Sequence, residues 1–259
     1  MASRTGRAEP LPGTAGTSGR RGAEVLALPP GRELRPETER WIVDGLVEAM
    51  PGLRARELFA LRRDMLAEAG YIVVAVDPQR DAVVALLTSR WVPLPSGRPC
   101  LHVMTQFVGD AYRHGAIFGR SWAAHFARLL AEGRPFPEVI ALKTYNPVVH
   151  CAMNAFAVHP GVRLYPDLTG AHDAALPLVT EVAGAVAPGH PFDAGRCVFP
   201  GAGRPVDLYR ERPLSSAEAA NAYFGRHLVP GDRMLCVLHA PTPAGQHGIL
   251  TALGLARPE

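Results

Sequence analysis

The alternation of apolar and polar positions predicts two helices in the first third of the chain. Pro36 fits the first turn of a helix. Five apolar residues then recur at helical spacing and give this helix one buried face: Trp41, Val43, Leu46, Val47 and Met50. Pro51 and Gly52 end it. The next period predicts a second helix over residues 53–69, with Leu58, Leu61 and Met65 inward and Gly70 as its stop.

The period then changes to that of strands. Residues 71–76 and 82–90 are β-rich and joined by a short polar segment, which predicts a hairpin, and residues 100–108 predict a third strand. A helix is expected from about Phe118 to Glu132, with Phe118, Trp122 and Phe126 inward. A short strand over 138–143 follows, and Asn146 is placed to cap a helix that begins at Pro147 and ends near residue 156.

The last hundred residues are less regular. They predict a strand over 162–165, a helix over 178–186, a capping box at 215–218 that opens a helix to about Leu228, and a final strand over 233–239. Strands mixed with helices in this order indicate a three-layer α/β domain.

Composition changes this picture mainly at the N-terminus. The chain has 259 residues, of which 47% are hydrophobic, but residues 1–35 are rich in Gly, Pro, Ala and Arg. We expect residues 1–35 to be a disordered tail, because they hold little apolar surface to offset the entropy of ordering. Residues 36–259 are expected to form one domain, with a core at 36–166 and an extension at 167–259 that completes the sheet and the acceptor site.

Charge, cysteines and hydropathy exclude several classes of protein. Residues 1–35 hold six Arg and three Glu, so the rest of the chain carries 21 basic and 21 acidic side chains and does not look like a nucleic-acid-binding body. Lys143 is the only lysine among the 27 basic residues, which we attribute to GC-rich codon usage. The four cysteines form no CxxC pair, and no apolar run reaches membrane-spanning length. We therefore expect a cytoplasmic protein without membrane contact.

The segment with the most chemical information is VGDAYRHGAIFG, residues 108–119. It leaves a strand, passes through small residues and enters a helix. Unpaired N–H groups and the positive dipole end at a helix start attract phosphates, and Arg113 adds a charged fork.

This segment and the order of elements resemble the GNAT superfamily of acyltransferases over about residues 36–158. The family motif V-x-P-x-Y-R-G-x-G-I-G is matched by Val108, Tyr112, Arg113 and Ile117. Other residues stand at its Pro and Gly positions: Asp110, His114, Ala116 and Phe118. The resemblance implies a GNAT-like three-layer fold with a central mixed, mostly antiparallel sheet. It also implies that acetyl-CoA or another acyl-CoA binds along Phe107, Val108, Arg113, His114, Gly115, Ala116, Ile117 and Phe118.

A second stretch, KTYNPVVHCAMNAF at 143–156, strengthens the resemblance. Family members often read N-P-x-A after a strand, and Asn146 and Pro147 match. The resemblance places Asn146 at the pantetheine arm. The family's Tyr that protonates the leaving thiolate is replaced by Met153, so His150, one turn earlier on the same helix side, is a candidate substitute.

His102 is the candidate general base, because it lies on the strand expected to line the cleft and the acceptor amine must lose a proton before it attacks the thioester. An unpaired N–H near Phe107 or Val108 would bind the thioester oxygen. The ten histidines form no HxH or HExxH pattern, so no metal site is expected.

The sequence thus predicts an N-acyltransferase that moves an acyl group from acyl-CoA to a small amine. Two alternatives stay open. The donor is an acyl carrier protein, which presents the same pantetheine arm without a nucleotide, or the domain binds a ligand without catalysis. The altered Gly and Tyr positions fit either alternative.

Overall fold

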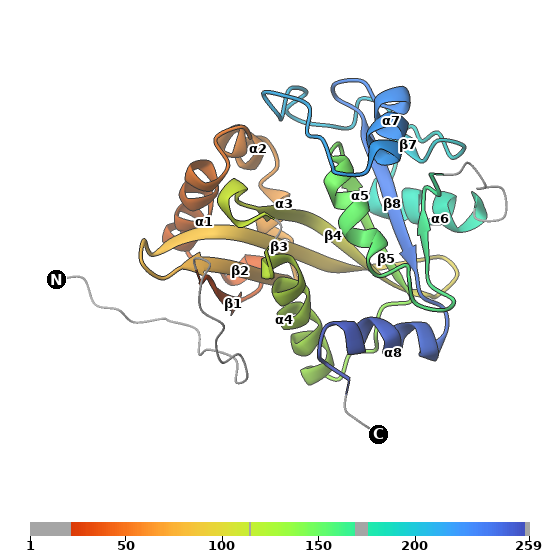
Figure 1. Ribbon diagram of the computed structural model, residues 1–259, viewed down its shortest axis with the longest axis horizontal. Helices are drawn as coiled ribbons and strands as arrows, with labels where there is room; N and C mark the ends of the chain where they lie inside the picture. Colours follow the sequence, from red (N-terminus) through yellow and green to blue (C-terminus); the bar gives the residue numbers. More distant parts are fainter. Residues whose placement is uncertain (1–21, 114, 169–175, 257–259) are drawn as a thin grey trace.

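A single twisted sheet of eight strands organises the protein in the computed structural model, which describes residues 22–113, 115–168 and 176–256 (Figure 1). The strands are β1 (Glu24–Leu28), β2 (Tyr71–Asp77), β3 (Ala82–Pro93), β4 (Pro99–Val108), β5 (Val139–Thr144), β6 (Arg163–Tyr165), β7 (Val198–Phe199) and β8 (Arg233–His239). Their order is β1-β2-β3-β4-β5-β8-β6, with β7 also on β8. Among the described strands, only β4 and β5 pair in parallel, so the predicted mixed, mostly antiparallel sheet is confirmed.

Helices cover both faces of this sheet. The α-helices are α1 (Pro36–Ala49), α2 (Ala55–Leu61), α3 (Asp64–Ala67), α4 (Ile117–Ala131), α5 (Pro147–Asn154), α6 (Leu176–Val186), α7 (Glu218–His227) and α8 (Pro243–Ala252). Short 3-10 turns lie at Gly31–Glu33 and Asp110–Tyr112. Within the described part of the chain, none of these helices combines the length and apolarity needed to cross a bilayer.

The alternation of β2 shows how the layers are built. Ile72 and Val74 face α1 and α2, where they join a core with Leu46, whereas Val73 faces α4 and joins a core with Trp122. Successive strand residues point to opposite faces, so an uninterrupted apolar run serves two cores at once. Figure 1 shows α1 and α4 on opposite faces of the sheet.

The expected tail is wrong for residues 22–35. Glu24–Leu28 pairs antiparallel with β2 as the first strand of the sheet, and Gly31 N–H donates to the Ala69 carbonyl at 2.8 Å. Four apolar residues in a row, at 25–28, are enough for a short edge strand when a neighbour supplies the hydrogen bonds. The part of the predicted tail at 1–21 lies outside the described residues.

The single helix expected over 53–69 is also wrong. It is divided into α2 and α3, because Arg62 leaves the helical path and its guanidinium binds the carboxylate of Asp64 through two bonds of 2.9 and 2.8 Å. Leu61, expected inward, is 60% exposed. This break places Arg62 at the site described below.

In the C-terminal part of the chain, β8 inserts between β5 and β6 with six residue pairs to β5. The predicted capping box does not form: α7 begins at Glu218, and the Ser215 hydroxyl binds the backbone of Ala217 instead. Helix α8 was not expected from the sequence.

Candidate active site

The two parallel strands at the centre of the sheet separate partway along their length. Pairing between β4 and β5 covers only Cys100–Val103 and Val139–Leu142, although β4 continues to Val108 and β5 to Thr144. Beyond this point β5 no longer covers the edge of β4. The backbone groups of Met104 to Val108 on that edge are therefore available to an extended ligand.

A β-bulge lies where the strands separate. On the other edge of β4, Thr88 pairs with Thr105 and Ser89 with Val103, so Met104 has no residue opposite. A bulge bends its strand and re-aims the following side chains. Directly after it, the hydroxyl of Thr105 and both amide atoms of Gln106 are buried without a hydrogen-bond partner. Buried polar atoms of this kind are rare unless a ligand or water satisfies them.

Two connected cavities open at this separation. The inner one has a volume of about 80 Å³ and lies between β4, β5 and the segment that follows β7. The outer one, about 500 Å³, runs past the end of β4 to the start of α5 and the loop after α1. Four residues line both and form their junction: Gln106, Phe107, Val149 and Tyr209.

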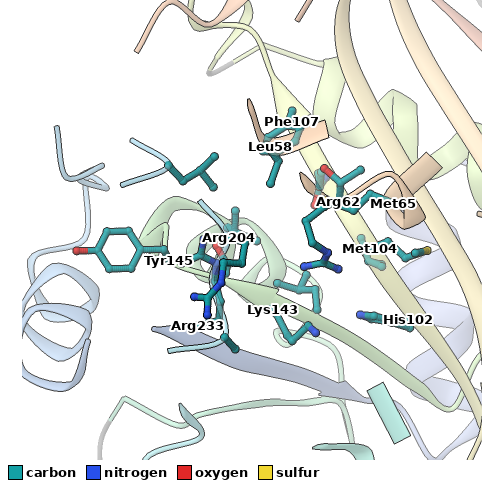
Figure 2. A pocket seen from close by; sticks show the side chains of 18 of the residues that line it. Leu58, Arg62, Met65, His102, Met104, Phe107, Lys143, Tyr145, Arg204 and Arg233 are labelled. Carbon is teal, nitrogen blue, oxygen red and sulfur yellow. The ribbon is translucent and has the colours of Figure 1, made fainter. Parts of the chain in front are cut away.

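The inner cavity is basic. Its charged lining residues are Arg62, Lys143, Arg204 and Arg233, and no Asp or Glu is among the described residues that line it. Figure 2 shows Arg62 and Lys143 pointing into the same space with His102 beside them, and Arg204 close to Arg233. These side chains come from four separate parts of the chain, which explains why no local motif reveals them.

Lys143 is the central member of this basic group. No described carboxylate forms an ion pair with it; its ammonium lies 5.6 Å from the centre of the Phe199 ring. Burial, followed by the positive charge of Arg62, lowers the pKa of Lys143 to about 8; Arg90 and Arg233 act in the same direction, and the Asp64 carboxylate opposes them in part. An ammonium in these surroundings is weakly compensated, because desolvation disfavours its charged form.

Arg233 resembles Lys143 in its surroundings. It is only 9% exposed, and its guanidinium donates to the Asp232 carbonyl at 2.7 Å. The Asp232 carboxylate does not neutralise it directly, since its two oxygens accept from the N–H groups of Gly201 and Val229. Burial lowers the pKa of Arg233.

The candidate base His102 lines the inner cavity but is a weak base. It is 4% exposed, and its Nδ1 has no hydrogen-bond partner. Burial, then the charges of Lys143 and Arg90, lower its pKa to about 3. The ring is therefore neutral at physiological pH and suited to accept a hydrogen bond rather than to hold a proton.

Tyr209, which sequence reasoning missed, lies at the junction of the cavities. Its ring stacks on Tyr145 at 6.3 Å between centroids. Burial raises the pKa of Tyr209, against the smaller opposing effects of Arg233 and of a hydrogen bond with Asn146. A phenol that keeps its proton is suited to donate it to a leaving group.

The outer cavity contains part of the predicted coenzyme site. Phe107, Val108, Arg113, Phe118 and Asn146 line it. Arg113 forms an ion pair of 2.7 Å with Asp110, and both side chains are nearly half exposed. Phe118 serves the core as well, since its ring packs on Trp122 at 6.2 Å and Phe156 at 6.1 Å.

Asn146 caps α5 as predicted. Its Oδ1 accepts from the Val148 N–H at 2.9 Å, and Thr144 Oγ1 accepts from the Asn146 N–H at 2.9 Å. Pro147, the first helical residue, needs no such partner. The cap fixes the start of α5 at the cavity junction.

Other predicted site residues lie elsewhere. Gly115 and Ala116 are exposed and do not line the outer cavity, and Ile117 is buried in a small core with Tyr112. His114 lies outside the described residues. His150 is 4% exposed and lines neither cavity; its Nε2 is 3.0 Å from the Pro166 carbonyl oxygen, and burial lowers its pKa. His150 therefore occupies a structural position in α5. In the described part of the chain, no three His, Cys, Asp or Glu side chains are grouped to hold a metal ion.

Comparison with known proteins finds distant matches among solved structures. No family model and no curated protein sequence matches the chain. Among solved structures, an aminoglycoside acetyltransferase, meta-AAC0020, from an uncultured soil metagenomic sample matches at 14% identity, with 52% of this chain and 84% of that one covered and a TM-score of 0.36.

Two further matches are similar in extent. The GNAT family N-acetyltransferase YhbS from Escherichia coli, solved with CoA, is 15% identical over 53% of this chain and 70% of its own, with a TM-score of 0.36. The histone acetyltransferase HPA2 and related acetyltransferase from Corynebacterium glutamicum is 17% identical over 54% and 86%, with a TM-score of 0.36.

Proposed function

We propose that the protein is an acyltransferase that moves an acyl group from the thioester of acyl-CoA to a small amine. The observation that carries the proposal is the separation of β4 from β5 at Val103 and Leu142, with the unpartnered amide of Gln106 at the junction of two cavities. An extended pantetheine arm carries amide groups that can pair with a free strand edge. The outer cavity, at about 500 Å³, is within the usual range for a ligand of that size.

The junction is the place for the reacting carbonyl. Backbone N–H groups of β4 beyond Val103, together with the Gln106 amide, are positioned to hold the thioester oxygen as negative charge develops on it. In the reaction, the amine nitrogen attacks the carbonyl carbon, the C–N bond forms, the C–S bond breaks, and the thiolate takes a proton.

Two side chains are assigned to the proton transfers. The phenol of Tyr209 donates to the departing thiolate, since it keeps its proton at neutral pH and lines both cavities. His102 accepts a hydrogen bond from the amine and orients its lone pair, while the amine proton leaves to solvent. Neither role needs a metal.

A second donor is favoured by one observation at the outer cavity. Arg113 is already paired with Asp110, and Phe118 lines the outer cavity at a position where the family motif has glycine. Both features weaken a site for a pyrophosphate. They would matter less for a pantetheine arm carried by an acyl carrier protein.

Calorimetric titration with acetyl-CoA and with acetyl-pantetheine distinguishes an acyl-CoA donor from a carrier-protein donor and from a domain without acyl transfer. Acyl-CoA transfer predicts saturable binding of acetyl-CoA and thiol release when amines are added. The variant Val149→Trp, which fills the junction, should abolish this binding, whereas Val158→Trp, at a valine 73% exposed, should not. Equal affinity for both thioesters would favour the carrier-protein donor. Binding of neither would reject acyl transfer.

A further inference from the structure

The inner cavity carries more positive charge than a site for an ordinary amine requires. Arg62, Lys143, Arg204 and Arg233 line it, and among the described residues only Arg62 has a carboxylate in ion-pair contact, that of Asp64. Asp64 lies outside the lining. An acceptor with a free amine and no other charge would gain nothing from three remaining cations, and a polyamine would be repelled by them.

We propose that the acceptor is an amine that also bears an anionic group, a carboxylate or a phosphate, and that Lys143 and Arg233 bind this group in the inner cavity. That this ligand is an acyl acceptor rests on the proposed acyl-transfer function. The anion site itself is inferred from the residues that line the inner cavity.

The burial of Lys143 and Arg233 indicates that they bind a ligand. Unpaired charges inside a protein are costly, and a protein retains them chiefly where they bind or react. Arg233 uses one N–H for the Asp232 carbonyl, which leaves other donors of its planar fork for a carboxylate or phosphate. Arg204, which is exposed, donates to the carbonyls of Gly201 and Gly203.

The cavity's size and position agree with this occupant. A volume of about 80 Å³ exceeds the ~10–15 Å³ that one water needs and is far below the ~300–1,000 Å³ of sites for drug-sized ligands. A small charged group fits, whereas a large acceptor does not. Lys143 and Arg233 line the inner cavity and not the outer one, so they are not placed for the phosphates of a coenzyme that occupies the outer cavity.

Lys143 is the cation of the inner cavity that would hold the anionic group of the acceptor close to the reacting amine. It lies on β5 at the point where that strand leaves β4, in the same cavity as His102. An anion held there places an attached amine within the inner cavity, near the junction where the thioester is expected. The same anion offsets the charges that disfavour protonation of His102.

The test uses two probes of nearly the same shape, N-acetylglycine, which bears a carboxylate, and N-acetylglycinamide, which bears a neutral amide, titrated calorimetrically into the full-length protein. We expect N-acetylglycine to bind at least tenfold more tightly, with the preference falling as salt rises. Lys143→Met should remove most of the preference. Arg56→Gln, which removes a positive charge on α2 outside both cavities, should leave it unchanged.

A preference for the neutral probe, equal binding, or no binding of either at millimolar concentration would overturn the anion site, as would a preference that survives Lys143→Met. Acetyl-CoA binding is measured separately on the same proteins. An anion preference without acetyl-CoA binding would leave the site standing and reject the acyl-transfer function. Turnover of acetyl-CoA with amino-acid amides preferred over amino acids as acceptors would support the acyl-transfer function and reject the anion site.

Discussion

Replacing Lys143 by methionine should make the protein more stable. Methionine keeps most of the aliphatic length of the side chain but removes an ammonium that has no described carboxylate partner. Burial and the nearby arginines lower the pKa of Lys143 from 10.5 to about 8. Each pKa unit corresponds to about 1.4 kcal/mol, so the charged lysine costs the folded state about 3 kcal/mol at neutral pH.

The stability gained by Lys143→Met should decrease as the pH rises. The folded pKa lies below the unfolded one, so the unfolded chain binds more protons between pH 8 and 10.5, and wild-type stability rises with pH across that window. The cost is fully present below about pH 8. The advantage of Lys143→Met should therefore be greatest near pH 7 and should shrink as the pH rises towards 10.5.

Urea unfolding followed by circular dichroism at pH 7 and pH 9.5 measures both effects. We expect a gain of about 1–3 kcal/mol at pH 7 and less than half of it at pH 9.5. Lys143→Arg is the matched control, because arginine stays charged throughout and should give no gain. A Lys143→Met protein no more stable than the wild type, or a gain independent of pH, would refute the claim that a buried and weakly compensated charge lies here.

Three further changes test the site. Tyr209→Phe should lower kcat about a hundredfold with little change in KM, because it removes the proton donor but not the ring, while Tyr145→Phe should have a small effect; equal losses would contradict the assignment. Arg113→Ala should raise the acetyl-CoA Kd roughly tenfold at low salt, and Asp110→Asn should lower it by freeing Arg113; titration at two salt concentrations checks both. Asn146→Ala should cost about 1 kcal/mol in urea unfolding, and no loss would show that the cap contributes nothing.

The order of elements was readable from the sequence where one periodicity held for long enough. The strands at β2, β3, β4, β5 and β8 and the long helices α1 and α4 follow directly from their apolar spacing. The misses have local causes. Strand β1 is too short for its pattern to stand out from a Gly- and Pro-rich region, and only its pairing with β2 stabilises it. The break after Leu61 depends on the side-chain bond between Arg62 and Asp64, which helical periodicity does not register.

The candidate site divides in the same way. Asn146 was found because a cap and a following proline are adjacent in sequence, and Arg113 and Phe118 because they belong to one turn. The inner cavity has no such signature, since β4, β5, β8 and the segment after β7 contribute to it from positions that together span more than a hundred residues.

One signal in the sequence, which we attributed to codon usage, could have indicated a residue of the inner cavity. Lys143 is the single lysine in a chain that otherwise uses arginine, and codon usage explains the arginines but not the exception. Arginine stays charged in proteins, whereas a buried lysine adjusts its pKa. A lone lysine at the end of a predicted buried strand is therefore a reason to expect a functional side chain.

The central claim is that the separation of β4 and β5 holds a thioester between two cavities, and a crystal structure of the protein with acetyl-CoA tests it most directly. The account predicts the pantetheine arm along the free edge of β4, with the thioester carbonyl beside Gln106 and its sulfur within hydrogen-bond reach of the Tyr209 hydroxyl. Acetyl-CoA bound on another surface, or Gln106 and Tyr209 left without contact to the bound thioester, would contradict it.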